Sequence, residues 1–176
     1  MKGHVSIALE LGLFEMVSGR MAVSDPCYDR NAWCRGELEG VLNGTWRAQA
    51  EEQDSGKRIA RLIAFHEDYA YAKLPRMERA DFEVGVDSGQ AGLFDARHYR
   101  DDSVAWEPAT SPFGGRGAAW YELCCRTTST PMHGGVIPYG AVSNSGYGDG
   151  CYECTFWRND DGKVVRVEIE FIRSEK

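Results

Sequence analysis

The sequence has no long apolar run, and it has fewer basic than acidic residues. Across its 176 residues, no stretch approaches the length of about 18 apolar residues that a membrane-spanning helix needs. Twenty lysines and arginines stand against 27 aspartates and glutamates, which gives a formal net charge of −7. Because binding along nucleic-acid phosphates needs a basic face, we expect neither broad nucleic-acid binding nor a membrane span.

The sequence also lacks the common catalytic signatures. It contains no G-x-S-x-G, H-E-x-x-H, P-loop or dinucleotide-binding G-x-G-x-x-G pattern, and no internal repeat. No secretory signal is clear, because Glu10 and Glu15 interrupt the apolar residues near the N-terminus. We therefore expect a cytoplasmic protein without a cofactor, and the sequence leaves open whether the protein is an enzyme.

The composition indicates a small β-rich domain. A hydrophobic content of 43% and a charged content of 27% are typical of soluble globular proteins. Twenty glycines and short apolar runs favour strands and turns over long helices. The predicted fold is mainly β, a β-rich α+β class. It is an antiparallel β-sandwich or a partly open barrel with one or two short helices, in a single domain over residues 1–176.

The clearest predicted element is a β-hairpin near the C-terminus. Val165, Val167, Ile169 and Phe171 alternate with charged residues, the period of a strand with one buried and one exposed face. A turn-forming Asn-Asp-Asp-Gly segment precedes them, and residues 151–157 form the partner strand.

Weaker patterns predict the remaining elements. Further strands are predicted over residues 5–10, 20–23, 82–87 and 118–128, and a hairpin over residues 40–52 and 57–66. A turn or short helix is predicted over residues 28–34, a short helix over 95–102, a linker over 67–80, and a flexible loop or lid over 103–117.

The spacing of the cysteines permits a zinc site but does not favour one. Cys151 and Cys154 have zinc-ligand spacing, and Cys27 and Cys34 would complete a set of four. However, residues three apart in a strand point to opposite faces of the sheet. We therefore expect reduced, mostly buried thiols instead.

Three carboxylates follow strands beside proline or glycine: Asp25, Asp87 and Asp149. A glycine-rich turn, residues 146–150, holds the last of them. If the strand ends meet, these side chains would form an oxygen-rich cluster suited to Mg²⁺ or Ca²⁺ and to metal-assisted hydrolysis. Aspartates that only stabilise turns are the commoner case, so the metal site is the minor alternative.

Three stretches together resemble a known family. They are residues 21–26 (MAVSDP), 86–95 (VDSGQAGLFD) and 145–152 (SGYGDGCY), and their order and spacing also fit. They are similar to the bacterial domain-of-unknown-function family 4241. The resemblance covers most of the chain and implies a fold neighbourhood but no reaction.

The preferred functional hypothesis is a binding module without catalysis. The candidate ligand-binding residues are Asp25, Asp87, Gln90, Tyr147 and Asp149. Aromatic residues are expected to line the same pocket or face: Tyr28, Trp33, Tyr139, Tyr147 and Trp157. The partner would be a small molecule or a protein, in an inhibitor, immunity or sequestering role. A metal-dependent hydrolase and a structural or assembly protein are the alternatives.

Overall fold

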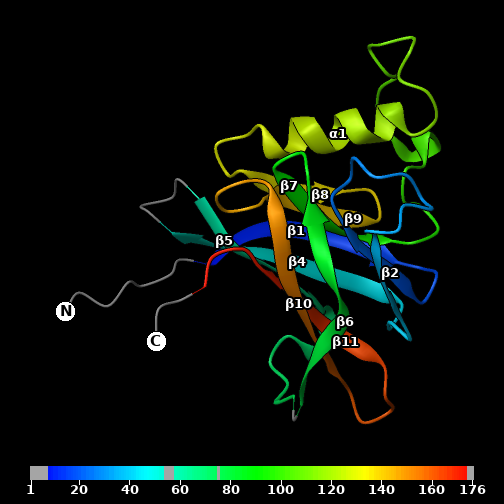
Figure 1. Cartoon of the computed structure of the whole chain (residues 1–176). Helices are drawn as coiled ribbons and strands as arrows, with labels where there is room; N and C mark the ends of the chain where they lie inside the picture. The colour runs from blue at the N-terminus through cyan, green and yellow to red at the C-terminus, as the bar shows by residue number, and fades with distance from the viewer. Residues whose placement is uncertain (1–7, 54–57, 75, 174–176) are drawn as a thin grey trace.

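The computed structural model describes residues 8–53, 58–74 and 76–173, and within them eleven strands form two antiparallel sheets. The first sheet has the order β1-β4-β5-β11-β10-β6 (Figure 1). Its strands are β1 (Ala8–Met16), β4 (Gly44–Gln53), β5 (Arg58–His66), β6 (Met77–Val86), β10 (Gly150–Arg158) and β11 (Val164–Glu170). The second sheet has the order β3-β2-β7-β9-β8. Its strands are β2 (Arg20–Ser24), β3 (Gly36–Glu39), β7 (Gln90–Asp95), β8 (Gly134–Ile137) and β9 (Gly140–Asn144).

The main hydrophobic core lies between the two sheets. Trp46, Leu62, Val84, Leu93 and Ile169 are all fully buried there. They come from both sheets, because alternate side chains of each strand face the other sheet. The arrangement is therefore a β-sandwich that is not closed into a barrel, which is one of the two β-rich architectures that the sequence predicted.

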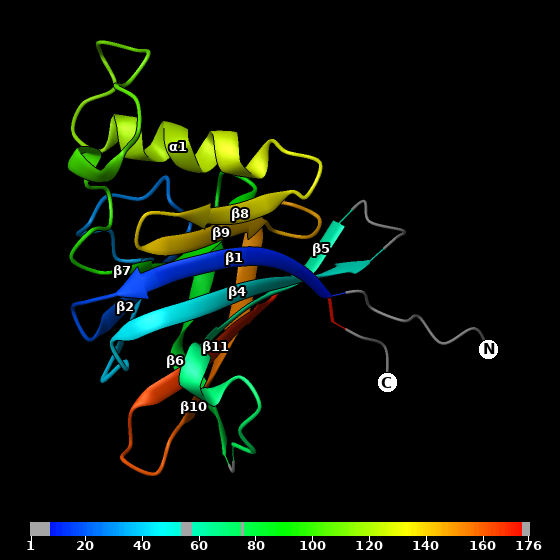
Figure 2. The same cartoon turned by 180° about the vertical axis from the view of Figure 1, so that it is seen from behind.

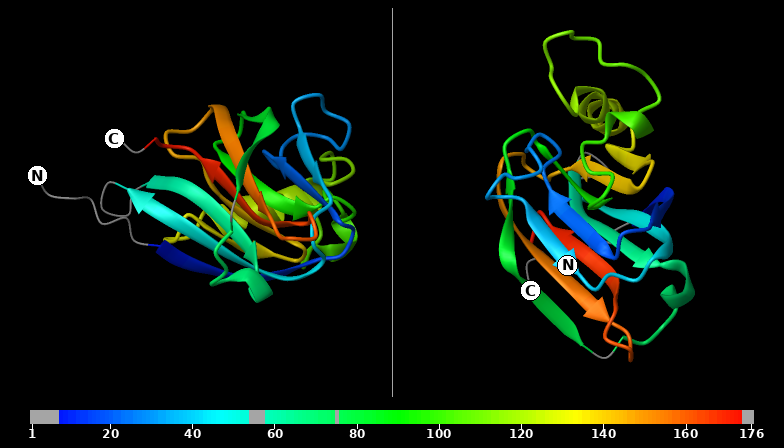
Figure 3. Two further views of the ribbon diagram at one scale, coloured as in Figure 1. Left: turned by 90° about the horizontal axis from the view of Figure 1, so that it is seen from below. Right: turned by 90° about the vertical axis from the view of Figure 1, so that its right-hand side faces the viewer.

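A single α-helix within the described residues, α1 (Ala118–Thr128), covers the outer face of the second sheet (Figures 2 and 3). Trp120 of this helix packs edge-on against Phe94 and Tyr99, with ring centroids 4.9 and 5.0 Å away. Asp102 accepts hydrogen bonds from the backbone N–H groups of Gly117 and Trp120, at 2.8 and 3.0 Å. The carboxylate thus satisfies donors that a helix start leaves unpaired.

The predicted C-terminal hairpin is confirmed. β10 and β11 pair antiparallel, with Cys154 opposite Ile169 and Phe156 opposite Val167. The hairpin of β4 and β5 is also confirmed, although its predicted turn at 54–56 lies outside the described residues. The predicted strand over residues 20–23 is present as β2, and the one over 82–87 lies within β6. Residues 5–7 of the first predicted strand lie outside the described residues.

Several local predictions were wrong. Residues 118–128 form the helix α1 instead of a strand, because its buried residues recur every three or four positions to cover the second sheet. Residues 95–102 form turns instead of a helix, and a 3-10 turn, η2 (Asp102–Val104), follows them. Residues 28–34 form turns, one of the two alternatives that the sequence left open. The linker predicted over 67–80 holds the 3-10 turn η1 (Glu67–Tyr69) and the start of β6. Strands β3, β7, β8 and β9 were not predicted as such.

No helix in the described part of the chain has the length and apolar character needed to cross a membrane.

Candidate binding cleft

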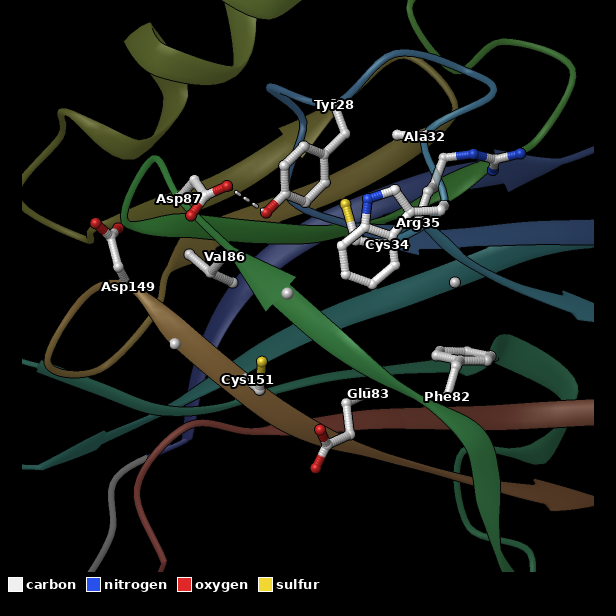
Figure 4. Close-up of a pocket in the computed structure, with 14 residues that line it drawn as sticks. Tyr28, Ala32, Cys34, Arg35, Phe82, Glu83, Val86, Asp87, Asp149 and Cys151 are labelled. Carbon is white, nitrogen blue, oxygen red and sulfur yellow. Dashed lines mark hydrogen bonds between the residues drawn. The ribbon is translucent and has the colours of Figure 1, made fainter.

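A cleft lies where the edge strands of the two sheets, β6 and β3, come together. Its volume is about 920 Å³. Residues from the β2–β3 loop, from β6 and from the start of β10 line it: Tyr28, Ala32, Trp33, Cys34, Arg35, Gly36, Phe82, Glu83, Gly85, Val86, Asp87, Asp149, Gly150 and Cys151 (Figure 4). Two glycines bring the loop and the strand close together. The Phe82 ring occupies the space where Gly36 would carry a Cβ atom.

Gly85 shapes the floor of the cleft. A Cβ atom at this position would lie 3.5 Å from the Tyr28 hydroxyl oxygen and 3.7 Å from the Cys34 Cβ atom. Both side chains therefore lie directly above the strand. Cys151 pairs with Gly85 in the β6–β10 register, and paired residues project to the same face of a sheet. The missing side chain of Gly85 lets Tyr28 and Cys34 approach the strand closely.

The Tyr28 side chain closes one end of the cleft. Its hydroxyl donates a hydrogen bond of 2.7 Å to Oδ2 of Asp87 (Figure 4). Burial, this hydrogen bond and the neighbouring Cys34 together raise the pKa of Tyr28 well above its usual range. The phenol therefore stays protonated and holds the β2–β3 loop against the end of β6.

Asp25 organises the turn that follows β6. This fully buried carboxylate accepts hydrogen bonds from the N–H groups of Cys27, Asp87 and Ser88, and from the Ser88 hydroxyl, at 2.6–2.9 Å. Burial, followed by the hydrogen bond to Asp25, raises the pKa of Cys27 to about 12. Asp25 therefore stabilises the wall of the cleft and does not line the cleft itself.

Asp149 lies at the opposite edge of the same turn. Its Oδ1 accepts a hydrogen bond of 3.1 Å from the N–H group of Gly89, and its side chain lines the cleft. The three strand-end aspartates thus all contact residues 87–89 or belong to them. The three aspartates therefore lie around one turn, which the sequence alone left open. The Asp25 carboxylate, however, already accepts hydrogen bonds from N–H and O–H groups.

The two other candidate residues lie elsewhere. Gln90 is buried beneath α1, where its amide donates to the Cys125 sulfur at 3.3 Å and accepts from the Thr128 hydroxyl at 3.3 Å. Tyr147 is exposed, with the Arg58 guanidinium 4.5 Å from its ring centroid. Neither residue lines the cleft beside β6 or the groove beside β1.

The predicted aromatic set is divided in the same way. Tyr28 and Trp33 line the cleft. Tyr139 stacks on His98, with centroids 3.8 Å apart, and lines a second groove of about 420 Å³ beside β1. The Arg166 guanidinium lies over Trp157 on the first sheet. None of residues 103–117 lines the larger cleft, and Trp106 of this loop lines the second groove.

Sequence patterns missed several lining residues. Cys34 and Arg35 lie in an irregular segment with no strand or helix period, and Glu83 looked like an ordinary exposed position of a strand. Arg35 donates from Nη2 to Glu37 at 2.8 Å, and its guanidinium lies 5.1 Å from the Tyr99 ring centroid. Its Nη1 atom is buried without a hydrogen-bond partner among the described residues.

Metal binding finds no support in the side-chain positions. Among residues 8–53, 58–74 and 76–173, no group of three or more His, Cys, Asp or Glu side chains is placed to hold a metal ion. All six cysteines are free. Cys151 is exposed and Cys154 is buried, as expected for two residues three apart in a strand.

These features define a helix-covered antiparallel β-sandwich with a cleft at one open side. The chain belongs to the family described as "Protein of unknown function (DUF4241)", whose model matches residues 14–169. The resemblance carried by the three sequence stretches is thereby confirmed. The searches of curated proteins and of solved structures gave no match.

Proposed function

We propose that this protein is a non-enzymatic binding module that holds a small molecule in the cleft between β6 and the β2–β3 loop. The main support for this proposal is the cleft itself, which has a volume of about 920 Å³ and is lined by aromatic, aliphatic and sulfur-containing side chains. Small-molecule sites typically measure about 300–1,000 Å³ and combine apolar walls with a few polar groups.

The chemistry of the lining favours binding over catalysis. The lining residues include no histidine. The Tyr28 hydroxyl is held protonated by burial and by its hydrogen bond to Asp87. The buried Asp25 carboxylate near the cleft already accepts four hydrogen bonds from the protein. A protein that binds a compound without converting it fits a sequestering or inhibitory role.

A thermal-shift screen of the reduced protein against small molecules tests this proposal. A ligand present at about one hundred times its Kd adds about 2.7 kcal/mol to the free energy of unfolding, which raises Tm measurably. Two exposed tryptophans provide a matched pair of variants, because Trp33 lines the cleft and Trp106 lines the other groove. Trp33→Ala should reduce the Tm shift, and Trp106→Ala should leave it unchanged.

A panel that stabilises nothing contradicts the proposal, as does a Tm shift that survives Trp33→Ala and disappears with Trp106→Ala. A rise in Tm with Mg²⁺ or Ca²⁺ alone, reversed by EDTA, would favour the hydrolase hypothesis built on the aspartates instead. Filling the cleft gives an independent check. Because Gly85 faces Tyr28 and Cys34, Gly85→Leu should block the ligand by occupying its space.

A further inference from the structure

The charged side chains that line the cleft are mostly acidic. Glu83, Asp87 and Asp149 contribute three carboxylates, and Arg35 contributes the one guanidinium among the lining residues. The Arg35 guanidinium already pairs with Glu37 at 2.8 Å, and it points away from Glu83 and Asp149 (Figure 4). The Arg35 Nη1 atom has no hydrogen-bond partner among the described residues, but three carboxylates outnumber this one guanidinium, so the cleft presents a net negative surface.

Acceptor oxygens of these carboxylates remain available to a ligand. Asp87 uses Oδ2 for Tyr28, and Asp149 uses Oδ1 for the N–H group of Gly89. In the described part of the chain, the carboxylate of Glu83, another lining residue, has no hydrogen bond or ion pair. A cationic group that enters the cleft would meet unpaired acceptors, whereas an anionic group would meet charges of its own sign.

Aromatic rings complete the recognition surface. Tyr28, Trp33 and Phe82 line the cleft, and the Trp33 side chain is 96% exposed, so its indole face is open to a ligand. A ring face attracts an ammonium or guanidinium group through its quadrupole, and tryptophan does so most strongly. Aromatic side chains beside unpaired carboxylates are the combination that recognises organic cations.

We propose that the cleft binds a small organic cation, in which an ammonium or guanidinium group is carried on an apolar body. This inference rests on the binding function proposed above and adds the chemical class of the ligand. The apolar body packs along β6 beside Phe82 and Gly85. The cationic group lies near Asp87 and Asp149, which the β6–β10 register places level with each other. The volume of about 920 Å³ suits such a molecule.

Three probes that share one aromatic body separate charge from shape: 2-phenylethylammonium, 2-phenylethanol and phenylacetate. Their affinities are measured by isothermal titration calorimetry with the full chain at low and at high salt. The ammonium should bind about tenfold tighter than phenylacetate and also tighter than phenylethanol. High salt should weaken the binding of the ammonium, because exposed charges are screened.

Charge-removing variants locate the effect. Asp149→Asn should weaken the binding of the ammonium about threefold, in the range of partly exposed ion pairs. Glu83→Gln should weaken it less, because Glu83 lies four residues before Asp87 on β6. The amide oxygen that Asp149→Asn introduces can still accept the hydrogen bond from the Gly89 N–H group, so this variant should keep its fold. Glu39→Gln is the control, because Glu39 is exposed on β3 outside the cleft, and it should leave the affinity unchanged.

Phenylacetate binding as tightly as the ammonium, equal binding of all three probes, or no binding of the ammonium each overturns the inference. So does an equal loss of affinity in Glu39→Gln. The binding function itself is tested separately, by comparing the ligand-induced Tm shift in Trp33→Ala and in Trp106→Ala. A neutral or anionic ligand whose binding depends on Trp33 would reject the cationic class and keep the binding cleft.

Discussion

The carboxylate of Asp25 accepts a hydrogen bond of 2.6 Å from the hydroxyl group of Ser88, a residue 63 positions further along the chain. The same carboxylate also accepts the N–H groups of Asp87 and Ser88. The end of β2 is thereby joined to the turn between β6 and β7. Since the cleft lies on this turn, its shape depends on one fully buried side chain that does not line it.

Asp25→Asn should therefore destabilise the protein much more than Asp149→Asn. The asparagine amide replaces one acceptor oxygen with a donor that faces N–H and O–H groups, and a loss of about 3 kcal/mol is expected for a buried network of this kind. Asp149 makes one exposed hydrogen bond, which an amide oxygen can still accept, so the loss should stay below about 1 kcal/mol. Urea denaturation measures both, and equal losses would contradict the structural role of Asp25.

The parts of the fold that could be predicted are those in which local pattern and burial agree. Val165, Val167 and Ile169 alternate with charged residues, and all three are fully buried in β11. The helix α1 was missed for the opposite reason. Trp120 and Tyr121 favour strands by type, whereas Ala118 and Leu123 favour a helix. The aromatic residues outweighed the helical spacing of the side chains that pack on the second sheet.

The candidate site was predicted only in part for a similar reason. Asp87 follows β6 and Asp149 precedes β10, and both line the cleft. Gln90 looked equally suitable but is directed to the opposite side of its sheet, toward α1. Cys34 and Arg35 had no recognisable pattern, because they are placed by contacts of the β2–β3 loop with β6. Such contacts between distant segments follow from topology.

The aromatic cluster under α1 should contribute more to stability than any exposed tryptophan. Trp120 is 1% exposed and packs against Phe94 and Tyr99, so Trp120→Ala should cost about 3–5 kcal/mol through lost contacts and a cavity. Trp33→Ala removes a ring that is 96% exposed and should change the free energy of unfolding by less than about 0.5 kcal/mol. Chemical denaturation of both variants checks the difference. Similar losses would contradict the packing of α1 on the second sheet.

Two strand glycines should respond differently to one added methyl group. A Cβ atom at Gly92 would lie 2.2 Å from the Phe94 ring and 2.5 Å from the Ala141 carbonyl oxygen, so Gly92→Ala should destabilise the protein by about 1–3 kcal/mol. At Gly85 the nearest atom is 3.5 Å away, an ordinary contact distance. Gly85→Ala should stay within about 0.5 kcal/mol of the original protein. Thermal unfolding of the two variants measures both losses. A larger loss for Gly85→Ala than for Gly92→Ala would contradict the packing described at the cleft floor.

Cys154 and Cys151 lie three positions apart on β10 and should differ in their effect at alkaline pH. Cys154 is fully buried, and burial raises the pKa of its thiol from 9.0 to about 12. Between these values the unfolded state loses the proton while the folded state keeps it. The stabilisation is therefore complete below about pH 9 and is lost as the pH rises toward 12, by at most about 1.4 kcal/mol per pH unit.

The slope of stability against pH isolates this contribution, because Cys154→Ala also leaves a cavity that lowers stability at every pH. Urea denaturation from about pH 8 to about pH 11, which spans most of the interval between the two pKa values, should give a shallower decline for Cys154→Ala than for the original protein. Cys151→Ala should keep the original slope, because the Cys151 side chain is exposed. Alkylation of the native protein at about pH 8 should label Cys151 and leave Cys154 unreacted. Parallel slopes in all three proteins, or early labelling of Cys154, would contradict the burial of this thiol between the sheets.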